Sequence, residues 1–364
     1  MVIRWGVFSY YTEIQAKDEL HPMVHDVQIS IVVPAYNDPE SLRECLAALQ
    51  ATAPAAAEII VVDDASSDET PTVAARAGVI LLRLPRNSGP AAARNYGAQH
   101  AQGDILFFVD ADVVVAPNTI TQVLAVFTQH RDIAAVFGSY DAQPRAQDVM
   151  SQYRNLLHHF VHTHGDPNAS TFWAGCGAIR RAVFFAVGGF DERRFPRPSV
   201  EDIELGYRLR QAGYRILLDK SLQGTHLKRW TLRSVIWTDT ACRAIPWSQL
   251  MLTSKETVSD LNVSSGQRLS VALVGLALAA LLGALAYPQL LVLALAALVG
   301  VGVINRALYA FFYQRRGLLF AAACVLFHLL HYVCSGIGYG YAWWEVQVRR
   351  KTISMLPGPM HRHL

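Results

Sequence analysis

The sequence predicts an α/β domain with a mostly parallel sheet, followed by amphipathic helices and a C-terminal helical region that crosses a membrane. The first observation is that short β-branched runs alternate with helical patterns, an order typical of parallel sheets. The second is the distribution of charge. Only 17% of the 364 residues are charged, against roughly 25% in soluble proteins, and residues 269–304 carry no charge. The net charge of +3 is too small to imply a nucleic-acid partner.

Short apolar runs predict buried strands, and helical patterns separate them. The first helix has the clearest signals, because Asp38 can cap it, Pro39 suits its first position, and apolar residues recur at i, i+3, i+4 and i+7 from Leu42. We expect strands at 28–33, 58–62, 79–84 and 105–109, and further helices at 70–77 and 91–101.

Acidic residues follow two of these strands, where parallel sheets bind ligands. Asp63 and Asp64 follow the second strand, and Asp110 and Asp112 follow the strand at 105–109. Two carboxylates one residue apart can hold a divalent cation that also binds substrate phosphates. A solvated turn is the alternative for Asp110 and Asp112, and helix capping is the alternative for Asp63 and Asp64. Asp68 is a further candidate cap.

The uncharged stretch breaks at 287–289, so it predicts a helical hairpin in a membrane. A third apolar run at 318–344 ends in an aromatic cluster typical of a membrane interface. Buried helices of a soluble domain are the alternative. Basic residues on both flanks of the hairpin predict an integral protein of the cytoplasmic (inner) membrane with a cytoplasmic catalytic domain. A third span would place the basic residues 349–351 outside, against the same rule, so the number of spans stays open.

Apolar and basic residues, among them Arg233, Arg243 and Lys255, alternate ahead of the membrane region. They predict amphipathic helices on the cytoplasmic leaflet, with core packing as the alternative. No signal peptide is expected, because charged residues interrupt the N-terminal segment.

Several motifs in fixed order resemble glycosyltransferase family 2, whose members have the GT-A fold. These are ISIVVPAYN (29–37), IIVVDDASSDET (59–70), NSGPAAARN (87–95), GDILFFVDAD (103–112), FWAGCGAIR (172–180) and GGFDE (188–192). With the resemblance, the expected organisation is an N-terminal extension (1–27), a GT-A domain (28–230), amphipathic interface helices (231–268), about three transmembrane helices (269–345) and a tail (346–364).

The resemblance implies a site for a nucleotide-sugar donor. Asp64 would accept a hydrogen bond from the base, supported by Asp63, while Asp110 and Asp112 would hold Mg²⁺ or Mn²⁺ against the diphosphate. The implied donor-binding residues are Pro34, Tyr36, Asp64, Gly89, Arg94, Asp110, Lys228 and Arg229. Gly89, Arg94 and Asn95 open a helix, where free backbone N–H groups favour anions; a salt bridge is the alternative for Arg94.

By the same resemblance, Asp202 is the general base for the acceptor. Ser199 is expected to cap its helix, and the helix dipole and free amides are expected to keep the carboxylate ionised. An ordinary first-turn acid is the alternative reading. The implied acceptor-side residues are Trp173, Gly175, Glu201 and Trp230.

The segment HLKRW at 226–230 departs from the membrane-bound polysaccharide synthases of this family, which carry Gln where this chain has His226. The departure puts processive synthesis in doubt. His226 is a candidate third metal ligand, with a packed or surface histidine as the alternative. For the run His158, His159, His162 and His164, lining of the acceptor site is preferred to zinc binding, because no structural-site spacing is present.

The sequence therefore predicts a membrane-anchored, metal-dependent inverting glycosyltransferase. It would move a sugar from a nucleotide-diphosphate sugar to a hydroxyl of a lipid or lipid-linked acceptor at the cytoplasmic membrane face. The alternatives are a polyprenyl-phosphate glycosyltransferase, a processive polysaccharide synthase, and a nucleotide-sugar-binding membrane protein without turnover.

Overall fold

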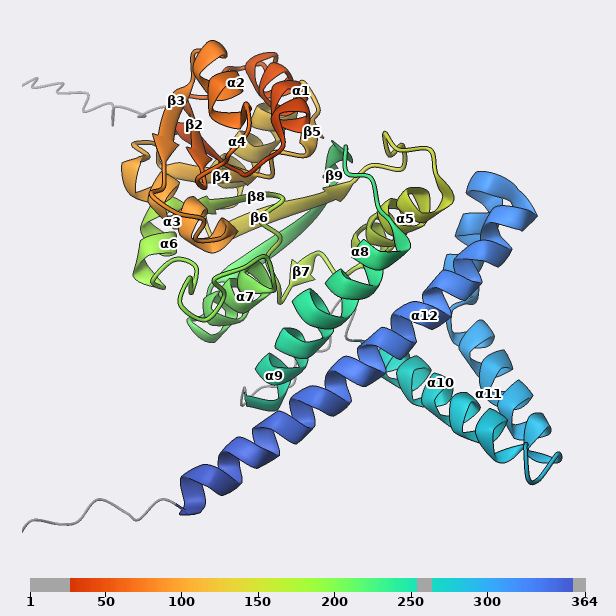
Figure 1. Cartoon of the computed structure of the whole chain (residues 1–364). Coiled ribbons are helices and arrows are strands. Elements are labelled where there is room, and N and C mark those ends of the chain that lie inside the picture. The colour runs from red at the N-terminus through yellow and green to blue at the C-terminus, as the bar shows by residue number, and fades with distance from the viewer. Residues whose placement is uncertain (1–26, 254–263, 356–364) are drawn as a thin grey trace, which may run out of the picture.

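The structure, a computed structural model, describes residues 27–253 and 264–355. Within these residues a nine-stranded mixed sheet runs in the order β3-β2-β1-β4-β8-β6-β9-β5, with β7 paired to β9 (Figure 1). The strands are β1 (Ile29–Ala35), β2 (Glu58–Asp63), β3 (Ile80–Arg83), β4 (Ile105–Val109), β5 (Val113–Val115), β6 (Ile133–Tyr140), β7 (Asn168–Ala169), β8 (Cys176–Arg180) and β9 (Arg215–His226). The helices of this domain are α1 (Pro39–Gln50), α2 (Thr70–Arg76), α3 (Pro90–His100), α4 (Thr119–Gln129), α5 (Val149–His164), α6 (Arg181–Ala186) and α7 (Glu201–Gln211).

The first four strands in sheet order are parallel, as the alternation of strands and helices predicts. Ala35 at the end of β1 pairs with Asp63 at the end of β2, and Val32 pairs with Phe108 of β4. The carboxyl ends of β1, β2 and β4 therefore meet at one edge of the sheet. Beyond β4 the sheet becomes mixed, because β8 runs antiparallel to both β4 and β6.

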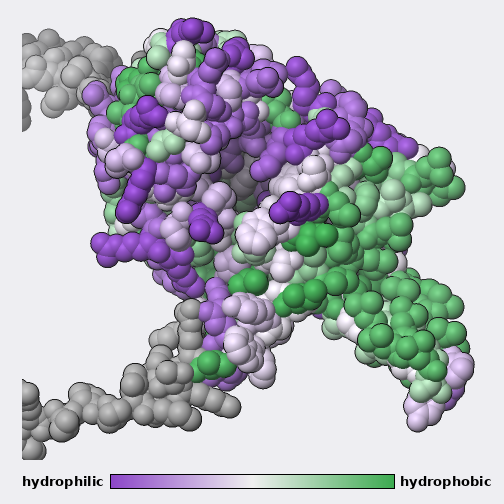
Figure 2. All heavy atoms as spheres, in the orientation of Figure 1, coloured by the Kyte–Doolittle hydropathy of each residue, from purple (hydrophilic) through white to green (hydrophobic). Residues whose placement is uncertain are grey.

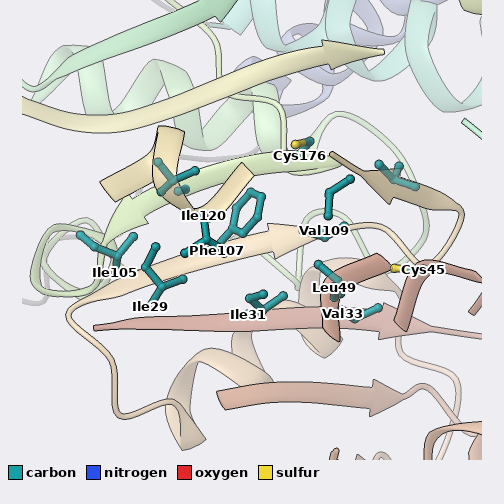
Figure 3. Close-up of a cluster of buried hydrophobic side chains, with 14 of the residues drawn as sticks. Ile29, Ile31, Val33, Cys45, Leu49, Ile105, Phe107, Val109, Ile120 and Cys176 are labelled. Carbon is teal, nitrogen blue, oxygen red and sulfur yellow. The ribbon is translucent and has the colours of Figure 1, made fainter. Parts of the chain in front are cut away.

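Helices cover both faces of the sheet, so the central strands are almost wholly apolar. On one face Ile31, Val33 and Phe107 pack with Leu49 of α1 (Figure 3). The intervening residues point to the opposite face, where Val32 and Phe108 belong to a second buried cluster. Asp38 caps α1 as predicted, because its Oδ1 accepts a hydrogen bond from the Ser41 N–H at 3.2 Å.

The segment after the sheet forms a nearly continuous rod of α8 (Leu232–Trp237), a π-helical turn η1 (Thr238–Ala244) and α9 (Ile245–Thr253), which lies along α12 (Arg306–Met355) (Figure 1). Its apolar residues divide between two environments. Trp237 is 63% exposed, whereas Trp247 is buried and packs with Val200 ahead of α7. The core-packing alternative therefore holds for Trp247, and the position of the exposed side chains on a membrane leaflet stays a prediction. Residues 254–263, including Lys255, lie outside the described residues, as do 1–26 and 356–364.

The predicted hairpin is formed by α10 (Ser265–Gly283) and α11 (Leu290–Ile304), which pack against each other. In the described residues two helices are long and apolar enough to cross a membrane, at 265–283 and 306–348, and α11 is a shorter apolar helix. The third apolar run lies inside α12, which is interrupted at Gly317 by a φ of +80°. Hydrophobic side chains cover the outer surface of these helices, in contrast to the polar α/β domain (Figure 2).

Candidate active site

The loop after β2 organises the start of α3. The two carboxylate oxygens of Asp64 accept hydrogen bonds from the backbone N–H groups of Ser88 (2.7 Å) and Gly89 (2.8 Å). Gly89 has a φ of +88°, and a Cβ there would lie 2.6 Å from the carbonyl oxygen of Pro196, so only glycine fits. Asp63 is buried and pairs with Arg83 at 3.0 Å. Asp64 therefore holds the loop that carries Gly89. Its own backbone N–H donates to the carbonyl of Ala35 at the end of β1 at 2.9 Å, between Pro34 and the half-exposed Tyr36.

Arg94 is buried between two carboxylates. Its Nη2 donates to Asp110 Oδ1 at 2.6 Å, and its Nη1 donates to Glu201 Oε1 at 2.9 Å. This links two residues that are 91 positions apart in the sequence, Asp110 at the end of β4 and Glu201 at the start of α7. The guanidinium charge is thereby neutralised within the protein, and Arg94 orients both acids. Asn95 next to it binds the backbone of Phe190 in the GGFDE segment.

Asp112 and His226 face each other across β5 and β9, with 3.4 Å between Asp112 Oδ2 and His226 Nε2. The adjacent residue Val113 is in register with His226, which fixes this pairing. Although burial alone raises the pKa of Asp112, the hydrogen bond and charge of His226 and the charge of Lys228 outweigh it and lower the pKa. Asp112 is therefore an anion at neutral pH.

These residues suit a hard divalent cation that is shared with a substrate. Mg²⁺ in particular is held by one or two protein carboxylates together with substrate phosphates, and imidazole nitrogen is an accepted ligand of the transition metals. Among the described residues no three His, Cys, Asp or Glu side chains are clustered for metal binding. Asp112 and His226 are brought together, whereas the carboxylate of Asp110 turns toward Arg94.

Asp202 and Asp110 both form hydrogen bonds with the backbone of one loop, at the neighbouring residues Ala174 and Gly175. Its Oδ2 accepts a hydrogen bond from the Ala174 N–H at 3.2 Å, and the Asp110 N–H donates to the Gly175 carbonyl at 3.1 Å. The ring of Trp173 covers Gly175, where a Cβ would come within 2.6 Å of the indole. The loop 173–175 therefore forms hydrogen bonds with both aspartates through adjacent backbone groups.

The prediction that Asp202 has a low pKa is wrong. Desolvation and the adjacent charge of Glu201 raise the pKa of Asp202 to about 7, outweighing the charge of Arg94 and two backbone hydrogen bonds. The predicted cap is also wrong. Val200 occupies the N-cap position of α7 without a side-chain capping hydrogen bond, and the Ser199 hydroxyl instead donates to the Cys242 carbonyl of η1 at 3.2 Å.

The HLKRW segment leads out of β9 into the interface helices. Lys228 is exposed and its Nζ lies 4.6 Å from the centre of the Trp230 ring. Arg229 is exposed and lies near Asp148, 3.5 Å away. Trp230 is buried, its backbone N–H donates to Ser151 of α5, and the guanidinium of Arg154 lies over its ring. The charge of Lys228 is among those that lower the pKa of Asp112.

An aromatic cluster lines the space between these groups. Tyr140 at the end of β6 stacks on His226, with ring centres 4.1 Å apart, and also contacts Trp173 and His158. Burial and neighbouring positive charges lower the pKa of His158 and, to about 4, that of His162, so both rings are neutral at pH 7. Of the other two histidines, His159 bonds the Tyr140 carbonyl and His164 is exposed.

Sequence reasoning missed Tyr140 and Arg154. Tyr140 had a usable signal, because it ends a strand of apolar residues and strand ends carry ligand-binding side chains. Arg154 had none, since its ion-pair partner Asp239 comes from an element far along the chain.

The mixed sheet with acidic side chains at the end of β4 defines a GT-A-like α/β fold. Residues 30–187 match the family model described as glycosyl transferase family 2. The chain therefore contains a family 2 glycosyltransferase domain, as its motifs predict.

Curated relatives share this domain. The chain is 28% identical over 225 residues to the pre-mycofactocin glycosyltransferase of Mycobacterium tuberculosis (strain ATCC 25618 / H37Rv), covering 57% of this chain and 44% of that protein. It is 31% identical over 237 residues to validoxylamine A glucosyltransferase of Streptomyces hygroscopicus subsp. limoneus, covering 55% and 51%. It is 36% identical over 121 residues to undecaprenyl-phosphate 4-deoxy-4-formamido-L-arabinose transferase of Sodalis glossinidius (strain morsitans), covering 31% and 37%. The chain thus spans about half the length of these relatives, or less.

Among solved structures, the mannosyltransferase PcManGT from Pyrobaculum calidifontis in complex with GDP-Man and Mn²⁺ matches with a TM-score of 0.47 and 19% identity, over 86% of each chain.

Proposed function

We propose that this protein is a membrane-anchored, inverting glycosyltransferase. It moves a sugar from a nucleotide-diphosphate sugar to a hydroxyl of a lipid or lipid-linked acceptor at the cytoplasmic face of the inner membrane. The observation that carries the proposal is the loop 173–175, which binds Asp202 through one backbone amide and the Asp110–Asp112 turn through one carbonyl. One short segment would thus position both the proposed base and the turn that carries the proposed cation ligand Asp112.

In this proposal Asp202 takes the proton from the attacking hydroxyl, which it can do because its pKa of about 7 lies near neutral pH. Trp173 and Tyr140 supply apolar ring faces to an acceptor sugar. Arg94 keeps Asp110 and Glu201 in place, so the charge beside Asp202 does not move. The transfer inverts the anomeric centre because the hydroxyl attacks in line, opposite the departing diphosphate.

The fitting cofactor is Mg²⁺ or Mn²⁺, held by Asp112 and His226, with Asp110 within the same turn. Such a cation supplies Lewis-acid stabilisation to the leaving diphosphate. Lys228 adds a second positive charge on the same side, since its charge acts on Asp112. Pro34, Tyr36, Gly89 and the Asp64-bound loop form the nucleotide side of the proposed site.

The apolar helices α10, α11 and α12 support the membrane anchor. Large apolar side chains on them are open to the surroundings, for example Leu319 at 87% exposed, and such continuous patches are rare on soluble monomers (Figure 2). The helix α8, in the rod of α8, η1 and α9 that lies along α12, also exposes apolar side chains. An acceptor held in the membrane would thereby arrive beside the site.

A second candidate is transfer to the phosphate of a polyprenyl lipid, favoured by the similarity to undecaprenyl-phosphate transferases. An anionic phosphate oxygen attacks without a general base, so the two candidates differ in their need for Asp202.

Transfer assays with the detergent-purified full chain test the proposal. UDP-, GDP- and dTDP-sugars are offered with membrane lipid extract, in the presence of Mn²⁺ or EDTA. We expect a nucleoside diphosphate and a new glycolipid to form with Mn²⁺, and both to be lost with EDTA because the leaving group is no longer stabilised. Turnover that is equal with EDTA would contradict the metal assignment, and no turnover with any donor would contradict the enzyme.

The pH profile should report the raised pKa of Asp202. A general base acts only when deprotonated, so kcat/KM for a hydroxyl acceptor should rise as the pH increases through about 7 and level off above it. Initial rates between pH 5 and 9 at saturating Mn²⁺ measure this. An acidic limb near pH 4, the value of an ordinary aspartate, would show that Asp202 is not desolvated or is not the base.

A further inference from the structure

Asp239 of η1 is a buried charge that joins the α/β domain to α12. The Nη1 of Arg154 on α5 lies 2.8 Å from Asp239 Oδ1 and donates a hydrogen bond to Oδ2 at 3.1 Å. Burial alone raises the pKa of Asp239, but the charge of Arg154 and the hydrogen bond from His331 outweigh it, so the pKa is lowered and Asp239 is an anion. The Nδ1 of His331 on α12 therefore donates to Oδ2, at 2.9 Å, because a carboxylate only accepts. Three elements that are distant in sequence meet in this Arg154–Asp239–His331 triad.

Stability is a poor explanation for the triad. The side chains of Arg154 and Asp239 are 5% and 1% exposed, and taking two charges out of water is costly. Replacing such a buried pair by apolar side chains often leaves stability unchanged or raises it. The helices α5 and α12 also have an apolar contact of their own, in which Tyr153 packs on Phe312 and Phe327. The charges of the triad are therefore better explained by what they position, and π-helical turns such as η1 occur frequently at functional sites.

The ring of Trp230 connects the triad to the proposed cation site. The guanidinium of Arg154 lies over this buried ring, 5.0 Å from its centre. The Nζ of Lys228 lies 4.6 Å from the same centre, and the ring of His226 is 6.4 Å away, within the range of aromatic contacts. Trp230 thus lies between a residue that the triad holds and two residues that the proposed function assigns to the cation and the leaving diphosphate.

The backbone of the HLKRW segment is held from the same two sides. The Leu227 N–H donates to the Asp112 carbonyl at 2.9 Å, and the Trp230 N–H donates to Ser151 Oγ at 2.7 Å. Ser151 precedes Arg154 by about one turn of α5, so one face of α5 holds both the backbone and the ring of Trp230. A shift of this face would displace the HLKRW segment relative to Asp112.

We propose that Asp239 and His331 are positioning residues for the cation site. They hold Arg154 against Trp230, and Trp230 in turn fixes the HLKRW segment. This inference rests on the proposed function, which places a divalent cation beside that segment. Because His331 belongs to α12, the cation site is fully ordered only when the apolar C-terminal helix is packed against the α/β domain.

Hydrogen exchange and Mn²⁺ binding test this with Asp239→Asn, using the full chain in uncharged detergent. We expect amides in peptides that span 226–231 to exchange about tenfold faster, as for the loss of one partly desolvated cation–π contact. Peptides from β2 should be unchanged. Mn²⁺ binding with UDP or GDP, followed by electron paramagnetic resonance, should weaken about tenfold, as when a partner behind a metal ligand is lost. Nucleotide binding without metal should be unchanged, because the loop held by Asp64 is separate from the triad.

Two kinds of variant separate positioning from folding. The double variant Arg154→Met with Asp239→Leu leaves no unpaired buried charge, and it should show the faster exchange and the weaker Mn²⁺ binding of Asp239→Asn. His331→Asn keeps an N–H donor near the position of Nδ1 and should behave as the wild type, whereas His331→Leu should show part of both losses. Wild-type exchange and Mn²⁺ affinity in the double variant would overturn the inference, and wild-type behaviour of His331→Leu would exclude α12 from it.

The matched control is Arg316→Gln, which alters another polar contact between α12 and α5, the hydrogen bond to Gln152. It should change neither measurement. Losses as large as those of Asp239→Asn would mean general loosening of α12 and would overturn the inference, as would equal losses of nucleotide binding with and without metal. Failure of the proposed function appears separately, as a wild type that binds no Mn²⁺ with either nucleotide. The exchange measurement needs neither metal nor substrate and then decides the positioning by itself.

Discussion

Asp202→Asn should lower kcat for transfer to a hydroxyl acceptor by about 10²- to 10⁴-fold, the range that general base catalysis contributes. Asparagine has the same shape and can still accept a backbone hydrogen bond, but it cannot take a proton. The KM for the donor should change little, since Asp202 contacts the loop at Ala174 and the start of α7. Steady-state rates with the donor and acceptor found in the transfer assay measure the effect.

Asp219→Asn provides the control, because this aspartate caps a turn in β9 remote from the loop 173–175 and should leave the rate unchanged. Full activity of Asp202→Asn would contradict the general base. Since an anionic phosphate needs no base, that result would favour the polyprenyl-phosphate candidate.

Asp112→Asn should reduce transfer by roughly 10³-fold, because Lewis-acid stabilisation of the leaving group is worth several kcal/mol and each 1.4 kcal/mol is a factor of ten. The variant loses the negative charge that faces His226 at 3.4 Å. Mn²⁺ binding in the presence of a nucleoside diphosphate, followed by electron paramagnetic resonance, should weaken in parallel.

Asp132→Asn is the matched control for this variant. Asp132 is exposed, pairs with Arg215 and precedes β6 at the opposite end of that strand from Tyr140. Its loss should affect neither metal binding nor transfer, as is usual for surface ion pairs. If Asp112→Asn bound Mn²⁺ as tightly as the wild type, Asp112 would not be a ligand of the cation.

Features that depend on neighbours in sequence were predictable. The cap of α1 by Asp38 needs only Ser41, three residues later. Burial of β1 and β4 follows from their own apolar composition, and the place of Asp110 and Asp112 follows from the end of β4. The hairpin of α10 and α11 likewise follows from two uncharged runs and a break.

Features that depend on contacts across the fold were not predictable. Arg94 joins Asp110 to Glu201, so its charge is taken up inside the protein. The pKa of Asp202 depends on burial and on Glu201, which outweigh the helix-terminal effects that predicted a low value. Ser199 binds η1 instead of capping α7, because the interface rod packs beside it.

By itself, the sequence determined the strand and helix order, the acidic strand ends, the family and the apolar C-terminal helices, because local pattern and composition encode these. Only the tertiary structure decided which carboxylates are neutralised, which acid has a pKa near neutral pH, and that η1 contacts both the start of α7 and α12. The physical reason is that charge, desolvation and access are set by neighbours brought together from distant parts of the chain, such as η1, which contacts Ser199 ahead of α7 and Gly338 of α12.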